Sequence, residues 1–176
     1  STSGTPTLPP VLVNDADPAG AMVSGILGDS LTDPDPKARE GIAVSGLTGS
    51  ADGAWQYSLD GGVAWTDFGP VSASSARLLR ATDLVRFVPH AGFVGSATLT
   101  YHGWDQTTGT PGETVNLGGG TGGSTSLSAA SESAMVSVIA QNTAPVLNPA
   151  ANPTLTAIAE DTTDPPGDLV SQVRGG

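Results

Sequence analysis

Residues Gly53 to Phe68 read GAWQYSLDGGVAWTDF, and this stretch decides the fold class. Apolar and polar residues alternate on both sides of Leu59-Asp60-Gly61-Gly62, and alternation with a period of two indicates β-strands. The two glycines accept the positive φ angles that tight hairpin turns require. The stretch therefore predicts a β-hairpin in which Tyr57 and Trp65 face each other across the strand pair.

The same period of two recurs along the chain between turn-forming residues. Predicted strands cover Ala21–Leu27, Ile42–Leu47, Ala54–Ser58, Val63–Trp65, Arg77–Leu79, Leu84–Val88, Ala97–Trp104 and Ser133–Ala140. A short helical turn within Ser75–Asp83 is an alternative, and the Gly/Ser-rich segment Leu117–Ser131 predicts a flexible loop. Many short strands separated by turns predict an all-β protein, an antiparallel sandwich.

Composition excludes several classes of protein and partner. Gly (24 residues) and Pro (14) are abundant while charged residues make up 13%, a balance that disfavours long helices. The net charge of −11 disfavours nucleic acid and anionic membrane surfaces as partners. No apolar run reaches the length of a membrane span, so we expect no membrane insertion. Without cysteine the fold has no disulfide, and a bound metal is one substitute for that stabilisation.

The two ends of the chain resemble each other. Residues 6–26 read PTLPPVLVNDADPAGAMVSGI, and residues 153–173 read PTLTAIAEDTTDPPGDLVSQV, at a constant offset of 147 residues. The shared pattern Asp-Pro-x-Gly-x-x-Val-Ser favours a true duplication, and a fixed period is typical of tandem repeats. We therefore expect a repeat domain over residues 1–143. Residues 144–176 would form the linker and the opening strand or strands of the next repeat.

Acidic residues gather in three groups. The first holds Asn14, Asp15 and Asp17; the second Asp29, Asp33, Asp35 and Glu40; the third Glu160, Asp161, Asp164 and Asp168. Calcium takes six to eight oxygen ligands, and Asp33-Pro34-Asp35 can direct two carboxylates at one ion. Asp-Pro pairs are also ordinary turn formers, so solvated turn residues remain the alternative interpretation.

Catalytic patterns are missing from the sequence, and we expect no enzyme activity. His90 and His102 are the only histidines, and the serines do not stand in a nucleophile motif such as G-x-S-x-G. The three tryptophans, Trp55, Trp65 and Trp104, favour core positions over a sugar-binding platform.

The stretch from Gly41 to Leu147 resembles a cadherin-like tandem repeat of giant bacterial surface adhesins, the extender repeats of RTX-type adhesins. The residues that carry the resemblance are GIAVSGL (41–47), GAWQYSLDGGVAWTDF (53–68), LLRATDLVRFVPHAGFVGSATLTYHGWD (78–105), SAASESAMVSVIA (128–140) and NTAPVL (142–147), with the acidic opening TDPDPKAREG (32–41).

This resemblance implies an extracellular Greek-key β-sandwich of the immunoglobulin/cadherin-like type, strung head to tail with calcium at the junctions. The calcium ligands that it implies within this repeat are Asn14, Asp15, Asp33, Asp35, Glu40 and Asp105. Glu160 and Asp161 would serve the junction with the following repeat.

The resulting functional hypothesis is a non-catalytic spacer or adhesive module of a large protein on the bacterial cell surface. Its partners would be neighbouring repeats of the same polypeptide or like chains, and a host-surface or glycan ligand. Two alternatives stay open. The first is a subunit of an extracellular filament or surface layer joined head to tail by strand addition. The second is a carbohydrate-binding β-sandwich.

Overall fold

The structure is a computed structural model, and it describes residues 6–28, 39–147, 150 and 154–170. The predicted ligands Asp33 and Asp35 lie outside the described residues. The chain divides into two compact units, residues 1–141 and 142–176.

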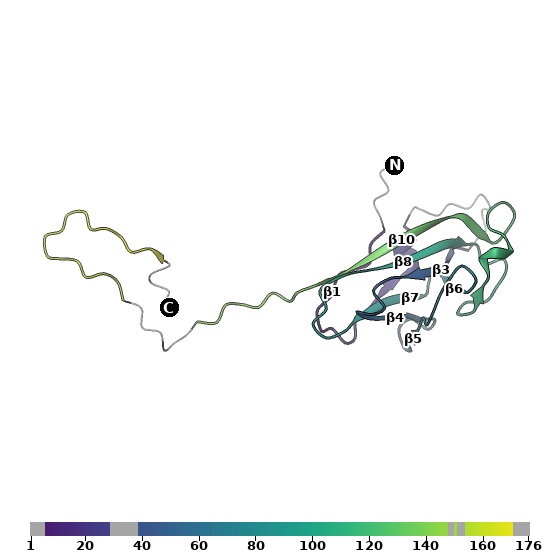
Figure 1. Ribbon diagram of the computed structural model, residues 1–176, viewed down its shortest axis with the longest axis horizontal. Helices are drawn as coiled ribbons and strands as arrows, with labels where there is room; N and C mark the ends of the chain where they lie inside the picture. The colour runs from purple at the N-terminus through teal and green to yellow at the C-terminus, as the bar shows by residue number, and fades with distance from the viewer. Residues whose placement is uncertain (1–5, 29–38, 148–149, 151–153, 171–176) are drawn as a thin grey trace. The chain divides into compact units, whose positions relative to one another are not determined.

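The first unit is all-β, with strands in two sheets (Figure 1). The larger sheet has the order β1 (Val11–Leu12), β10 (Leu127–Ile139), β8 (Gly95–Trp104), β3 (Gly41–Leu47), β6 (Ala76–Arg80) and β9 (Thr114–Val115). The smaller sheet has the order β2 (Ala21–Met22), β7 (Leu84–Pro89), β4 (Gly53–Ser58) and β5 (Thr66–Asp67). The described helices are α1 (Val23–Leu27) and the 3₁₀ turn η1 (Leu117–Gly119).

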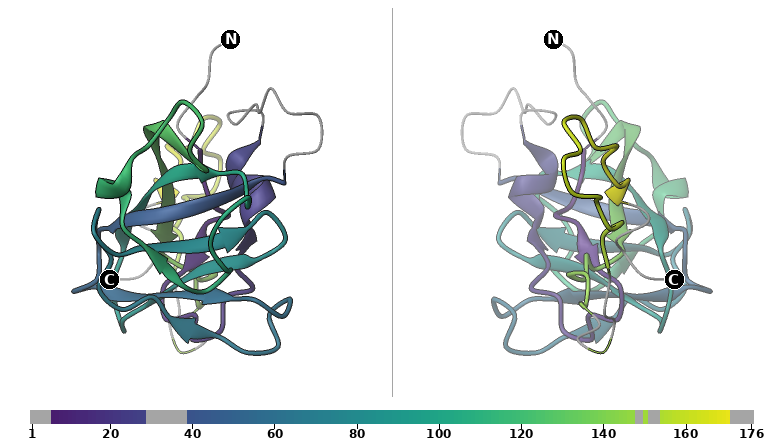
Figure 2. Two further views of the ribbon diagram at one scale, coloured as in Figure 1. Left: turned by 90° about the vertical axis from the view of Figure 1, so that its right-hand side faces the viewer. Right: turned by 90° about the vertical axis from the view of Figure 1, so that its left-hand side faces the viewer.

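The two sheets share one hydrophobic core. The larger sheet contributes apolar side chains from β3, β8 and β10, and the smaller sheet contributes those of β4 and β7. In β8 the buried residues are Ala97, Leu99 and Tyr101, which follow the period of two that the sequence predicts. Both views in Figure 2 place α1 at the margin of the strands, where its buried side chains Val23, Ile26 and Leu27 close that side of the core.

A second apolar cluster lies on the other face of the larger sheet. Trp104, Ala43 and Leu78 point to this face and are covered by Leu117 of η1 and by Leu127. The Asn116 side chain accepts a hydrogen bond from the Gly118 amide and so caps η1. The part of the Gly/Ser-rich segment around Leu117 is therefore packed against the sheet, and the flexible loop predicted for it is wrong there.

Three further details correct the sequence predictions. The strand predicted over Ala21–Leu27 ends after Met22, because Val23, Ile26 and Leu27 follow the helical spacing of one buried face. The strand predicted at Val63–Trp65 begins at Thr66, so Tyr57 lies opposite Thr66 and not opposite Trp65.

The pairing of the first strand is the remaining correction. Among the described strands every pair but one is antiparallel, as predicted, but β1 pairs parallel with β10, with Val11 opposite Val138. The hydrogen bonds from the Leu8 amide to the Met135 carbonyl (2.9 Å) and from the Val13 amide to the Ile139 carbonyl (2.8 Å) extend this pairing. The first segment of the domain is therefore held by its last strand.

Candidate functional site

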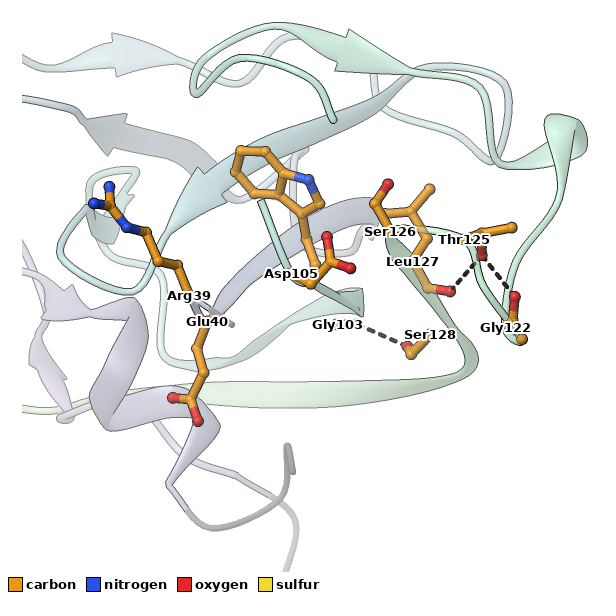
Figure 3. Close-up of a pocket in the computed structure, with 11 residues that line it drawn as sticks. Arg39, Glu40, Gly103, Asp105, Gly122, Thr125, Ser126, Leu127 and Ser128 are labelled. Carbon is orange, nitrogen blue, oxygen red and sulfur yellow. Dashed lines mark hydrogen bonds between the residues drawn. The ribbon is translucent and has the colours of Figure 1, made fainter. Parts of the chain in front are cut away.

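One pocket brings together two of the predicted calcium ligands. It lies where β3 begins and β8 ends, and it is lined by Glu40 and Asp105 together with Arg39, Trp104 and residues of the segment that leads into β10 (Figure 3). Register explains the meeting, because Gly41 lies opposite Trp104 in the antiparallel pair of β3 and β8. The residues that adjoin this pair, Glu40 and Asp105, must therefore be neighbours at this end of the sheet.

Some of the polar groups in this pocket are hydrogen-bonded within the protein. Asp105 accepts hydrogen bonds at Oδ1 from the Thr107 amide (2.8 Å) and the Thr107 hydroxyl (2.7 Å). The Glu40 carbonyl accepts a hydrogen bond from the Gln106 side chain (2.6 Å). Figure 3 shows the Glu40 carboxylate directed away from the Asp105 carboxylate, and Arg39 adds a positive charge to the same lining.

These residues alone do not make a calcium site. Calcium requires six to eight oxygens at about 2.3–2.6 Å, whereas the pocket offers two carboxylates that do not converge. Over residues 6–28, 39–147, 150 and 154–170, no group of three or more His, Cys, Asp or Glu side chains could hold a metal ion. The predicted calcium ligands that the structure describes therefore do not form a calcium site by themselves.

Asn14 and Asp15 lie at the other end of the domain. Asn14 accepts a hydrogen bond at Oδ1 from the Gly92 amide (2.8 Å), in the turn before β8, and Asp15 accepts one from the Asp17 amide (3.0 Å). Asp105 follows the last residue of the same ten-residue strand. At about 3.3 Å per residue, the two groups are separated by roughly 30 Å along the strand. Of the predicted ligands that the structure describes in the first unit, Asn14 and Asp15 therefore lie at one end, and Glu40 and Asp105 lie at the opposite end.

The remaining two predicted ligands, Glu160 and Asp161, belong to the second unit. Both side chains are exposed in a turn, and Asp161 has a positive φ of 66°. The turn is closed by a hydrogen bond from the Thr162 amide to the Ala159 carbonyl (3.3 Å).

A buried arginine cluster that the sequence did not indicate holds the first segment of the chain to β7. The Arg86 guanidinium stacks on the Trp65 ring, with Cζ 4.1 Å from the ring centroid, and donates from Nη1 to Asp17 Oδ1 (2.6 Å). It also donates to the Pro18 carbonyl (3.2 Å) and from Nε to Gln56 Oε1 (2.8 Å). We call Arg86, Trp65, Asp17, Pro18 and Gln56 the arginine clasp. Its members come from three separate stretches of the sequence, so no local motif predicts it.

Neither histidine has the partners of a catalytic base. The hydrogen bonds of the His90 and His102 rings go to the backbone carbonyls of Ala51 (3.2 Å) and Ser128 (2.9 Å). A nucleophile-activating histidine needs a hydroxyl or thiol on one ring nitrogen and an orienting group on the other. These two rings therefore show no geometry of nucleophilic catalysis.

The tryptophans do not form a platform for a sugar. Trp55 is buried and donates from its indole nitrogen to the Thr48 carbonyl (2.8 Å), and Trp104 is buried in the second apolar cluster. Trp65 is half-buried beneath Arg86. The core role that the sequence favours is confirmed for Trp55 and Trp104.

Comparison with protein-family models, with curated proteins and with solved structures gives no match for this chain. Among the described residues, no helix has the length and hydrophobicity needed to cross a membrane.

Proposed function

We propose that this chain is a non-catalytic, extracellular tandem repeat of a large bacterial surface protein, in which it serves as a spacer or adhesive module. The observation that carries the proposal is the arrangement of the first unit along its strands. Asn14 and Asp15 lie at one end of β8, Glu40 and Asp105 lie at the other, and β10 ends on the Asn14 side of the first unit. A module of this kind is suited to be joined end to end.

We also propose a specific sandwich type for the first unit. Two sheets around one core, with the first strand parallel to the last, support a Greek-key sandwich of the immunoglobulin/cadherin-like type. In such a series of domains, the neighbouring repeats are the first partners of each module. A host-surface or glycan ligand is a further partner, for which the buried tryptophans offer no support.

Calcium at the junctions is the part of the proposal that depends on residues of more than one repeat. Asn14 and Asp15 at one end would meet the counterparts of Glu40 and Asp105 at the other end of the following repeat. The predicted ligands Asp33 and Asp35 belong to the same proposal but lie outside the described residues. The resemblance implies that Glu160 and Asp161 serve the junction with the following repeat. As the counterparts of Val13 and Asn14, they would instead lie at the far end of that repeat and serve the junction after it. The net charge of −11 supports the binding of cations between the modules.

Thermal unfolding with and without calcium tests this proposal. A ligand that binds only the folded state raises the melting temperature by an amount that grows with the ratio of its free concentration to its Kd. Because a junction needs two repeats, the test uses two copies of residues 1–147 joined in tandem. We expect a higher melting temperature for this tandem chain in millimolar calcium than in EGTA. The rise should be smaller when the first copy carries Asp15→Asn and the second carries Asp105→Asn. Magnesium is the control cation. Equal melting temperatures in calcium and in EGTA would remove calcium from the proposal.

A further inference from the structure

Residues 7–23 form the first segment of the domain, and three kinds of contact dock this segment onto the rest. Its backbone pairs with β10 from Thr7 to Leu12. Its side chains Leu8, Val11 and Val23 are 6%, 8% and 0% exposed in the core. Its Asp17 and Pro18 bind Arg86 in the arginine clasp. We call residues 7–23 the docking segment.

The second unit repeats the backbone turn of the docking segment. Asn14 has a φ of 65°, and its counterpart at the 147-residue offset, Asp161, has a φ of 66°. In both copies the turn is closed by the same hydrogen bond, from Asp15 N to Leu12 O (3.1 Å) in the first and from Thr162 N to Ala159 O (3.3 Å) in the second. A positive φ is uncommon outside glycine, so agreement at matched positions adds a structural observation to the sequence repeat.

The apolar side chains of residues 154–170 follow the pattern that is buried in the docking segment. Leu155, Ile158 and Val170 are the counterparts of Leu8, Val11 and Val23, and they are 71%, 63% and 78% exposed. The positions of these three large aliphatic side chains are buried in the first copy. Their exposure in the second copy indicates a surface that binds a partner.

The residues of the docking segment that contact Arg86 or Trp65 are also repeated. Asp164, Pro165 and Gly167 stand at the positions of Asp17, Pro18 and Gly20. Gly20 has a φ of +78°, and a Cβ there would lie 2.7 Å from the Val85 carbonyl and 2.8 Å from the Trp65 ring. Only glycine permits the chain to pass this close to β7 and Trp65. The same glycine is kept in a segment where a Cβ would meet nothing within 4 Å.

One local interaction separates the two copies. In the second unit Asp168 accepts hydrogen bonds from the amide and the hydroxyl of Thr156 (2.6 and 2.5 Å), within the loop seen in Figure 1. The counterparts of this pair, Pro9 and Ala21, cannot form it. In the first copy Ala21 lies opposite Val85 instead, in β2. Docking would therefore exchange the Thr156–Asp168 contact for pairing with a strand equivalent to β7.

We propose that residues 154–170 are a second docking segment, and that its partner is a β-domain of this same kind whose arginine, stacked on tryptophan as Arg86 is on Trp65, binds Asp164. This inference rests on the tandem-repeat part of the proposed function and names the contacts through which the next domain is completed. It does not depend on calcium.

A segment exchange within the full chain tests the inference. In the chimera, residues 7–23 are replaced by residues 154–170, which have the same length, and the rest of residues 1–176 is unchanged. We expect cooperative unfolding with a melting temperature within about 10 °C of the parent chain. Two controls carry, at the same place, a shuffled version of residues 154–170 or the exchanged segment with Ile158→Asp. Both should melt far below the chimera or fail to fold.

Energetic coupling between Asp164 and Arg86 would show that the exchanged segment makes the specific contacts of the arginine clasp, which a melting temperature alone does not show. In the chimera, the effects of Asp164→Ala and Arg86→Ala on stability should be non-additive, as should those of Asp17→Ala and Arg86→Ala in the parent chain. A chimera with Asp168→Ala restores the residue type of Ala21 and removes the one unfavourable substitution in β2. The inference is overturned if both chimeras unfold like the shuffled control, or if the effects of Asp164 and Arg86 are additive. Either result leaves the calcium experiment unaffected.

Discussion

The Arg86 guanidinium donates to the Asp17 carboxylate at 2.6 Å across 69 residues of sequence, and the two partners differ sharply in exposure. The arginine side chain is 9% exposed, whereas the aspartate side chain is 88% exposed. The aspartate therefore stays largely solvated, and the buried cation depends on the pair more than the anion does. The interaction fixes where the first segment of the chain crosses β7.

Asp17→Ala should destabilise the first unit by about 1 kcal/mol. This is the upper range for partly exposed ion pairs, and it stays modest because Arg86 keeps its hydrogen bonds to Pro18 and Gln56. The free energy of unfolding in urea measures the loss. Asp52→Ala, which removes another exposed carboxylate, is the matched control and should change stability by less than about 0.5 kcal/mol. Equal losses in the two variants would show that the clasp does not stabilise the fold.

Gly53→Ala should destabilise the domain by about 2 kcal/mol. A Cβ at Gly53 would lie 2.4 Å from the Phe87 ring and 2.6 Å from the Val88 carbonyl, and Phe87 is fully buried. Neither group can move without disturbing the core or the β4–β7 pairing, and overpacking of this kind costs about 1–3 kcal/mol. Urea unfolding measures the difference.

Gly25→Ala in α1 is the opposite control for this substitution. An added Cβ meets nothing within 4 Å there, and alanine favours a helix over glycine. We expect a gain of about 0.5 kcal/mol. A loss at Gly25 as large as that at Gly53 would contradict the steric explanation.

Leu117→Ala should lower the free energy of unfolding by about 2–3 kcal/mol, although Leu117 stands in a Gly/Ser-rich segment. The side chain is buried against Trp104 and Leu78 in the second apolar cluster. Ser124→Ala, in the exposed part of the same segment, should have an effect below about 0.5 kcal/mol. If the two variants behave alike, the segment does not cover the sheet in solution.

The ionised Asp60 carboxylate should stabilise the domain, and this stabilisation should be lost in acid. Hydrogen bonds from the Ala64 amide (2.9 Å) and the Ser58 hydroxyl (2.7 Å) favour its charged form and lower the pKa of its carboxyl group. Because the pKa is lower in the folded state, the contribution is complete above the ordinary aspartate pKa of about 3.9 and is lost as pH falls through the folded value.

Asp60→Asn should remove this part of the pH dependence. The difference in unfolding free energy between the parent chain and the variant should shrink as pH decreases below about 4. Titration of the Asp60 carboxyl by NMR checks the direction of the shift directly. A folded-state pKa above that of an unfolded peptide would contradict the prediction.

The sequence predicts the strands that a period of two marks clearly. The predictions at Ile42–Leu47, Ala54–Ser58 and Leu84–Val88 agree with β3, β4 and β7 to within one residue at each end. The period fails at Val23–Leu27, where five residues are too few to distinguish a strand from one helical turn. It gives no signal for β1, because the parallel pairing of Val11 with Val138 depends on chain segments that are far apart.

The candidate site is predictable only in part, for a similar reason. Glu40 and Asp105 meet because β3 and β8 are antiparallel neighbours, which follows once the strands are placed. Asn14 and Asp15 carry the same residue chemistry but lie at the other end of β8, and composition alone cannot separate the two ends. The sequence carries no signal for the arginine clasp, since Arg86 resembles any charged residue on the polar face of a strand.

The parallel pairing of β1 with β10 also determines how the domain responds to tension. In a chain pulled from both ends, the force enters before Thr7 and leaves after Ile139, along two parallel strands. The hydrogen bonds between these strands, from Met135 to Ile139, then lie across the direction of pull and bear the load together. An antiparallel first strand attached at the same edge would instead open one bond at a time, so this edge gives the domain a shear-loaded mechanical clamp.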